Sequence, residues 1–225
     1  MLPPTLYAIA IDGPAGAGKS TAARALAKRL GFFLLDTGAI YRTLALHAGR
    51  QGIAQTDGPG LGALAARLPI RFDAESRVWL GDEDVSTAIR TPEMSQGAST
   101  VSAHPEVRAA LLGLQRQLAT RGRCVVEGRD IGTVVLPDAP IKFFLTARPE
   151  VRAQRRFDEL KARGQVNLDL AVTLKELQER DARDEQRATA PLKPAPDARL
   201  LDTSDLSFDE VVAEMEAVAK ERFKI

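Results

Sequence analysis

A glycine-rich turn near the start of the chain carries one lysine and two hydroxyl residues. Its letters, GPAGAGKST over residues 13–21, have the spacing G-x-x-x-x-G-K-[ST]; a predicted strand at 7–12 precedes them, and a predicted helix begins at the lysine. Glycines let the backbone curl so that successive N–H groups face one anion, and the helix N-terminus adds partial positive charge. The turn is therefore predicted to bind the phosphates of a nucleoside triphosphate.

The polar side chains of this turn have separate predicted roles. We expect Lys19 to bridge the β- and γ-phosphates, Ser20 to hold the Mg²⁺ that accompanies the nucleotide, and Thr21 to reach the α-phosphate. The residues predicted to bind the triphosphate are Gly13, Pro14, Ala15, Gly16, Ala17, Gly18, Lys19, Ser20 and Thr21.

Two further apolar runs end in polar side chains. The predicted strand at 32–36 ends in Asp36, and the predicted strand at 124–128 is followed by Arg129 and Asp130. Ligands bind at the carboxyl ends of the strands in α/β sheets, so these side chains are expected beside the glycine-rich turn. Other residues placed there by the segment LLDTGAIYR are Thr37, Tyr41 and Arg42, although Tyr41 alone reads equally well as a core residue.

Two charged stretches come later in the chain. RPEVRAQRR, residues 148–156, sets Arg152 and Arg155 on one helical face with Arg156 beside them; a solvated face paired with nearby glutamates is the alternative. In ERDARDEQR, residues 179–187, the inward helical stripe turns from apolar to charged. The stripe runs Leu170, Leu174, Leu177, Arg180, Asp184 and Arg187. We expect its last three residues to face a ligand cavity and to lack partners until the ligand binds.

Alternation of strands and helices predicts one parallel sheet with helices on both faces. Strands are expected at 7–12, 32–36, 124–128, 141–146 and 198–203. Helices are expected at 20–30, 38–49, 92–120 with a break near Pro105, 149–163, 168–188 and from Asp209 onward. Residues 51–92 change character, and short antiparallel strands around a turn at 73–76 are expected in this insertion.

Charge and composition limit the partners of this chain. Its 225 residues carry a net charge of +1, which argues against general binding of nucleic acid or a membrane surface. No apolar run approaches the 18 residues of a membrane span and no signal peptide is evident, so a cytoplasmic location is expected. The single cysteine, Cys124, is expected as a buried strand thiol rather than a nucleophile.

The motifs of the chain favour one class of phosphate-binding loop (P-loop) protein over others. The guanine-reading motif N-K-x-D of GTPase switches does not occur, and a short chain with several arginines near the expected site favours a small-molecule kinase. The rival interpretation is a protein that uses the nucleotide as a switch or ligand without transferring phosphate.

Five segments, in this order and spacing, resemble the bacterial cytidylate kinase family. They are IDGPAGAGKST, LLDTGAIYR, EGRDIGTVV, RAQRR and ERDARDEQRATAPL, spanning residues 11 to about 192, and GDEDVSTAIR in the insertion is similar as well. The resemblance implies an α/β, P-loop nucleoside-monophosphate kinase fold with a central parallel sheet, a small antiparallel-sheet insertion and a helical lid. It implies one domain, 1–225, with a core at about 1–37, 121–148 and 188–225, a monophosphate-binding region at about 38–120, and a lid at about 149–187.

The implied reaction transfers the γ-phosphoryl group of ATP to CMP or dCMP, with Mg²⁺ as the cofactor that accompanies ATP. We expect the chain to be a monomer. By the same resemblance, Lys19, Arg42 and Arg129 face the acceptor phosphate and the transferred group. The other implied site residues are Thr37, Arg108, Asp130 and Arg187 at the cytosine, Ser99, Arg180 and Asp184 at the ribose, and the lid arginines Arg152, Arg155 and Arg156. Ser102 is close enough in the sequence to make the ribose contact in place of Ser99. Another small P-loop kinase, acting on UMP, AMP or shikimate, stays open as an alternative.

Overall fold

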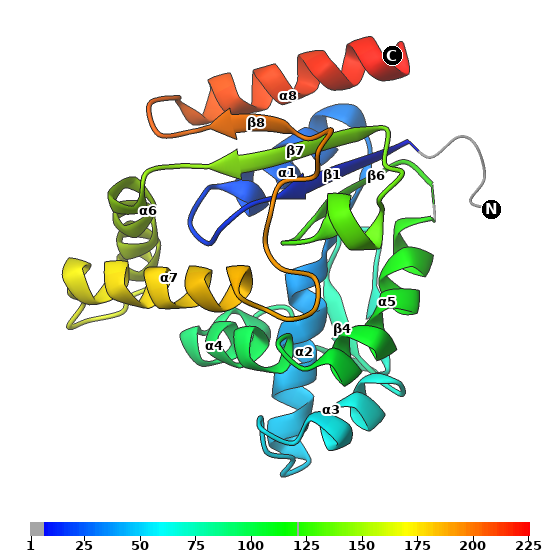
Figure 1. The fold of residues 1–225 in the computed structure, drawn as a ribbon, viewed down its shortest axis with the longest axis vertical. Helices are drawn as coiled ribbons and strands as arrows, with labels where there is room; N and C mark the ends of the chain where they lie inside the picture. The colour runs from blue at the N-terminus through cyan, green and yellow to red at the C-terminus, as the bar shows by residue number, and fades with distance from the viewer. Residues whose placement is uncertain (1–6, 121) are drawn as a thin grey trace.

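A five-stranded parallel sheet forms the centre of the computed structural model, which describes residues 7–120 and 122–225 (Figure 1). Its strands, in spatial order, are β2 (Phe33–Asp36), β6 (Cys124–Glu127), β1 (Ala8–Asp12), β7 (Ile141–Thr146) and β8 (Arg199–Asp202). Every neighbouring pair runs parallel, with Ile9 in register with Val125 on one side and Ile141 on the other. The predicted parallel sheet is confirmed.

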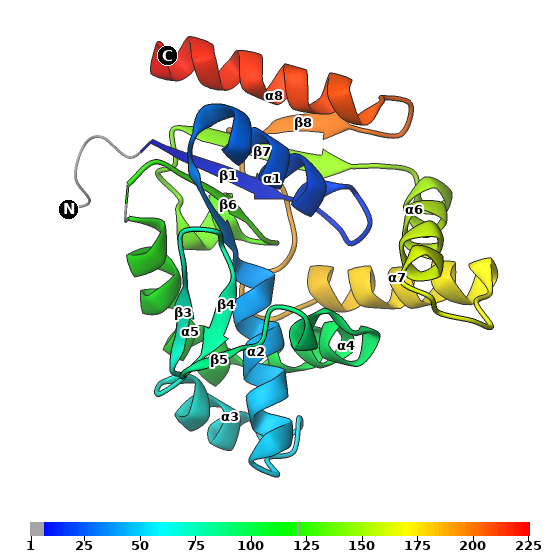
Figure 2. The same ribbon diagram turned by 180° about the vertical axis from the view of Figure 1, so that it is seen from behind.

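Helices cover both faces of the sheet because its strands are apolar on both sides. All five residues of β1 are buried; Ile9 and Ile11 belong to the core beneath α1 (Lys19–Leu30) and α8 (Phe208–Phe223). Ala8 and Ala10 belong to the core on the other face, beneath α2 (Thr37–Arg50) and α5 (Pro105–Ala119). Figures 1 and 2 show α8 beside β8, with α2 and α5 on the far side of the sheet.

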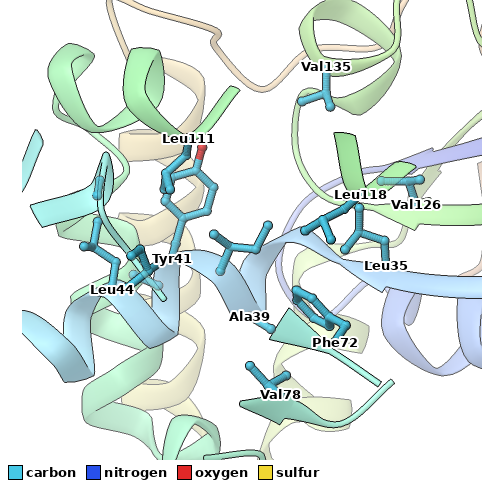
Figure 3. Close-up of a cluster of buried hydrophobic side chains, with 14 of the residues drawn as sticks. Leu35, Ala39, Tyr41, Leu44, Phe72, Val78, Leu111, Leu118, Val126 and Val135 are labelled. Atoms are coloured by element: carbon cyan, nitrogen blue, oxygen red, sulfur yellow. The ribbon is translucent and has the colours of Figure 1, made fainter. Parts of the chain in front are cut away.

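The insertion packs on α2 as a second, antiparallel sheet. Its strands are β3 (Ile70–Phe72), β4 (Val78–Leu80) and β5 (Glu83–Asp84), preceded by a helix that the sequence did not predict, α3 (Gly58–Ala65). Phe72 and Val78 lie near Ala39 at the start of α2 (Figure 3), so the insertion shares the core of the main domain. The 3₁₀ turn η1 (Ala88–Arg90) and helix α4 (Pro92–Val101) then lead to α5.

The segment after β7 folds into two helices, α6 (Pro149–Ala162) and α7 (Leu170–Glu185), which pack on each other. The strands β1 and β7 point toward this pair in both ribbon views (Figures 1 and 2). A short π-helical turn, η2 (Ile131–Val135), follows β6 and was not predicted. The predicted apolar stripe of α7 is wrong at its first position: Leu170 is exposed, whereas Leu177 is buried.

Within the described residues, no helix combines the length and apolar character that a membrane crossing requires.

Cys124 begins β6 and is buried, with its thiol donating to the carbonyl of Ala119 at 2.9 Å. Burial raises the pKa of this thiol to about 12, so the thiolate is scarce at neutral pH. We expect no reaction with a thiol-specific reagent at pH 8 in the folded protein and one equivalent per chain in denaturant. Stoichiometric labelling of the folded protein would contradict this account of β6.

Candidate functional site

A cavity of about 490 Å³ opens where the strands end and the α6–α7 pair begins. It is bounded by the P-loop, the ends of β2 and β6, one face each of α4, α5, α6 and α7, and the segment after β8. The carboxyl ends of the parallel strands therefore meet at this cavity, as expected for an α/β sheet.

The P-loop forms one wall of the cavity. Gly13 has φ 143°, and a Cβ there would lie 2.0 Å from the carbonyl oxygen of Leu145, so only glycine lets the loop leave β1 this close to β7. Of the nine predicted residues, Gly16, Ala17, Gly18, Lys19, Ser20 and Thr21 line the cavity; Gly13, Pro14 and Ala15 stand behind them. Lys19 donates to the carbonyl of Pro14 at 2.5 Å, and its pKa is lowered by burial and by Arg129.

Glu127, at the end of β6, was not singled out from the sequence although it lies in a quoted segment. Its carboxylate accepts a hydrogen bond from Ser20 Oγ at 2.7 Å. Burial and neighbouring Asp36 raise the pKa of Glu127 to about 7. Glu127 lies beside the P-loop because β6 is the neighbour of β1, the strand that leads into this loop. The order of the strands in the sheet was needed to see this.

Arg108 of α5 and Asp130, after β6, form a buried ion pair in another part of the cavity wall. Arg108 also donates to the Tyr41 hydroxyl at 3.3 Å, which shows how the tyrosine belongs both to the core and to the cavity wall (Figure 3). Burial raises the pKa of Asp130, although Arg108 opposes the shift. Thr37 lies nearby and donates to the carbonyl of Glu127 at 2.7 Å.

Asp12 supports this wall from behind. Its carboxylate accepts from the amides of Ile131 at 2.8 Å and Gly132 at 2.7 Å, so the end of β1 anchors the turn that carries Arg129 and Asp130. Burial raises the pKa of Asp12 to about 6 despite these two donors.

Asp36 accepts from Arg42 at 2.7 Å, and Arg90 approaches the same carboxylate at 3.7 Å. Arg42 was predicted in the site, whereas Arg90 was not and reaches the cavity from η1. Burial of Asp36 is outweighed by these two arginines, so its pKa is lowered.

Arg180, Asp184 and Arg187 line the cavity as predicted, although α7 ends at Glu185, so Arg187 follows the helix instead of lying on it. The expectation of missing partners is wrong for Asp184 and also for Arg187, which donates to the carbonyl of Ala190 at 3.0 Å. Asp184 accepts from Arg129 at 3.0 Å and faces Arg187 at 3.9 Å. Among the described residues, Nε of Arg180 and Nε of Arg187 are buried without a hydrogen-bond partner. Burial and nearby Arg129 lower the pKa of Arg180 to about 10.

Ser99 and Ser102 both line the cavity. Ser99 Oγ lies 3.4 Å from Arg183 Nε, and Ser102 Oγ lies 3.5 Å from Arg187 Nη1 while donating to the carbonyl of Ser99 at 3.1 Å. Arg183 is half-buried beside Ser99.

The predicted lid arginines separate into two groups. Arg155 and Arg156 line the cavity; Arg155 donates to the hydroxyl and the carbonyl of Thr203, and Arg156 pairs with Glu159 at 2.9 Å. Arg152 is not among the lining residues and is buried in an ion pair with Asp181.

The segment after β8 adds an apolar end to the cavity that sequence reasoning missed. Leu206, Phe208 and Val211 line it together with Thr203. A signal was available, because this segment follows the carboxyl end of an edge strand and so reaches the same edge of the sheet.

The cavity is strongly positive although the whole chain is nearly neutral. Ten lining side chains are lysine or arginine and five are carboxylates, against a net charge of +1 for the chain. Buried cations are costly unless anions compensate them, and focused positive charge attracts anions. The cavity is therefore suited to a ligand with several negative charges.

Binding of a polyanion should stabilise the fold because it supplies charges that the cavity lacks. Inorganic tripolyphosphate at about 100 times its dissociation constant should raise the free energy of unfolding by roughly 2.7 kcal/mol. For a chain of this size, this corresponds to a rise of about 5–10 °C in melting temperature. Arg180→Met should reduce this rise, while Arg199→Met, on an exposed pair with Glu214, should retain it. An equal rise with sodium chloride of the same ionic strength would contradict the account.

Comparison with known proteins identifies the family of the chain. A family model described as cytidylate kinase matches residues 9–221. The chain is 51% identical over 220 residues to a cytidylate kinase of Syntrophotalea carbinolica, covering 96% of this chain and 93% of that protein. It is 53% identical over 208 residues to a cytidylate kinase of Pelotomaculum thermopropionicum, covering 91% and 92% respectively.

A crystal structure of an uncharacterized protein from Eubacterium ventriosum aligns over 96% of this chain and 99% of that one, at 14% identity and a TM-score of 0.52, and supports the fold. At about half identity over nearly its whole length, the chain belongs to the cytidylate kinase family.

Proposed function

We propose that this cavity transfers the γ-phosphoryl group of ATP to CMP or dCMP, giving ADP and CDP or dCDP. One observation carries the proposal: the same positive cavity is lined by a P-loop and by a buried carboxylate–arginine pair. Two anionic nucleotides can meet there with their phosphates among the cations, which offsets their mutual repulsion.

ATP is assigned to the P-loop wall, with its phosphates on the backbone of residues 16–20 and on Lys19. The apolar end formed by Leu206, Phe208 and Val211 suits the donor base, since nucleobases bind against apolar side chains.

The residues around Ser20 fit Mg²⁺ that arrives with ATP. Ser20 Oγ and the Glu127 carboxylate offer hard oxygen donors 2.7 Å apart beside the P-loop. Within the described residues, no group of three or more metal-binding side chains occurs, which suits an ion held by one or two protein groups and by phosphate oxygens. When bound, Mg²⁺ neutralises charge on the β- and γ-phosphates.

The acceptor base is assigned to the wall formed by Arg108 and Asp130. A carboxylate accepts from the N4 amino group of cytosine, and arginines such as Arg108 and Arg187 donate to N3 and O2. Uracil presents a carbonyl oxygen in place of N4, so it faces Asp130 with like partial charge. Thr37 and Tyr41 border this base. Ribose contacts are assigned to Arg180 and Asp184, and to Ser99 or Ser102, which stand at similar positions.

Transfer needs no protein base. An acceptor phosphate oxygen, already anionic, attacks the γ-phosphorus; the bond to the β–γ bridging oxygen breaks, and its electrons leave with ADP. We assign Arg42 and Arg129 to the acceptor phosphate, and Lys19, Arg155 and Arg156 to the transferring group. Neither His47 nor His104 lines the cavity.

A coupled assay of ADP formation with CMP, dCMP, UMP and AMP tests the function directly. We expect CMP or dCMP to exceed UMP and AMP by at least tenfold in kcat/KM, because a mismatched buried polar group costs about 1–3 kcal/mol. UMP or AMP exceeding CMP tenfold would assign the chain to another small P-loop kinase. Absence of ADP formation with every acceptor would favour a nucleotide-binding protein without transfer.

Asp130→Asn keeps the shape of the side chain and removes its charge. We expect kcat/KM for CMP to fall about 10- to 100-fold while KM for ATP changes less than threefold, because Asp130 pairs with Arg108 rather than with a P-loop residue. Steady-state kinetics with each substrate varied measures both values, and a melting curve confirms that the variant is folded. Equal losses for CMP and ATP would contradict base reading by Asp130.

The monomeric state and the cytoplasmic location expected from the sequence stay predictions.

A further inference from the structure

Ala15, in the middle of the P-loop, contacts helices α6 and α7 and does not line the ligand cavity. Its amide donates to Asp181 Oδ1 of α7 at 3.2 Å, and its carbonyl accepts from Arg152 Nη1 of α6 at 3.0 Å. Both backbone polar groups of one P-loop residue are therefore bound by two helices that lie more than 130 residues away in sequence.

The same contact has an apolar part. The methyl group of Ala15 is buried in a small cluster with Ala153 of α6 and Leu177 of α7. Gly16 lets α6 approach, because a Cβ there would lie 2.9 Å from the carbonyl oxygen of Arg152. Ala15 thus fits into a socket formed by the two helices.

Arg152 and Asp181 form the polar floor of this socket. They make a buried ion pair, and Arg152 Nε donates to the carbonyl of Ala147 at 3.0 Å, so the guanidinium connects the end of β7, the P-loop and α7. Buried ion pairs add little stability compared with apolar residues of similar size, so stability alone is a weak reason for this pair.

The position of the pair relates it to the cavity. Arg155 and Arg156 follow Arg152 by about one helical turn, and Arg180 directly precedes Asp181. A shift of either helix along the P-loop would therefore move the arginines that line the cavity.

We propose that Arg152 and Asp181 are positioning residues that fix the α6–α7 pair to the P-loop through Ala15. In this role, they set the depth at which Arg155 and Arg156 meet the transferring phosphate and at which Arg180 meets the acceptor ribose. They also help to exclude water from the transferring phosphate. Misplacement of such groups by about 1 Å can cost 10²-fold in rate. The inference rests on the proposed function and assigns Arg152 a role outside direct contact with substrate.

The first test uses Arg152→Lys and Asp181→Asn, with Arg148→Lys and Asp205→Asn as matched controls on an exposed pair at the start of α6. For the test variants, we expect kcat for CMP phosphorylation to fall roughly 10- to 100-fold. KM for CMP should stay within threefold. We define the hydrolysis-to-transfer ratio as the rate of ATP hydrolysis without acceptor divided by the rate of phosphoryl transfer to CMP. This ratio should rise at least tenfold, because water enters the loosened site. The controls should match the wild type in both readouts.

A second variant separates positioning from stability. Arg152→Met with Asp181→Leu replaces the pair by apolar side chains and should melt at or above the temperature of Asp181→Asn, since no unpaired buried charge remains. We expect its transfer to stay low and its hydrolysis-to-transfer ratio to stay high.

Recovery of wild-type transfer and ratio in this double variant would overturn the proposal, because the pair would then serve stability alone. An unchanged ratio in Arg152→Lys and Asp181→Asn would do the same. Failure of the wild-type chain itself to phosphorylate CMP would instead overturn the proposed function.

Discussion

Ten lysine and arginine side chains line one cavity, and their mutual repulsion must be compensated for the chain to fold. A chain of net charge +1 places twice as many cations as carboxylates around this space. Such an arrangement is tolerated because the carboxylates are distributed among the arginines: Asp36 beside Arg42, and Asp184 beside Arg129. Nε of Arg180 is buried and has no hydrogen-bond partner among the described residues, and the bound acceptor nucleotide would supply one.

The fold brings these charges together through the edge of one sheet. The cationic lining residues come from segments far apart in the sequence, among them α1, α2, η1, α5, α6, α7 and the turn after β6. Two buried polar anchors hold the elements in register: Asp12 binds the turn after β6, and the Arg152–Asp181 pair binds the P-loop to α6 and α7. The cost of burying these groups is consistent with a structure selected for placement of charge.

Local patterns predicted much of this arrangement. The P-loop, Asp36 and the Arg129–Asp130 turn each follow an apolar strand, so their sequence neighbourhood alone places them at the sheet edge. Contacts between segments far apart in the sequence could not be predicted from such local patterns. Arg152 reads as one of several helical arginines, and only packing shows that it turns toward Asp181 while Arg155 faces the cavity. Helix α3 begins with two glycines and a proline in its first three residues, letters that indicate a turn, yet it is stabilised by packing on α5.

In the proposed reaction, one cavity binds both nucleotides, and their phosphates meet among the same cations. Calorimetric titration with cytidine and adenosine joined 5′ to 5′ by five phosphates tests it most directly, with ATP and CMP titrated separately for comparison. We predict a dissociation constant at least 100-fold below that of ATP, because the linked compound fills both nucleotide positions at the entropic cost of one ligand. Binding no tighter than ATP, with CMP still able to bind the resulting complex, would contradict it.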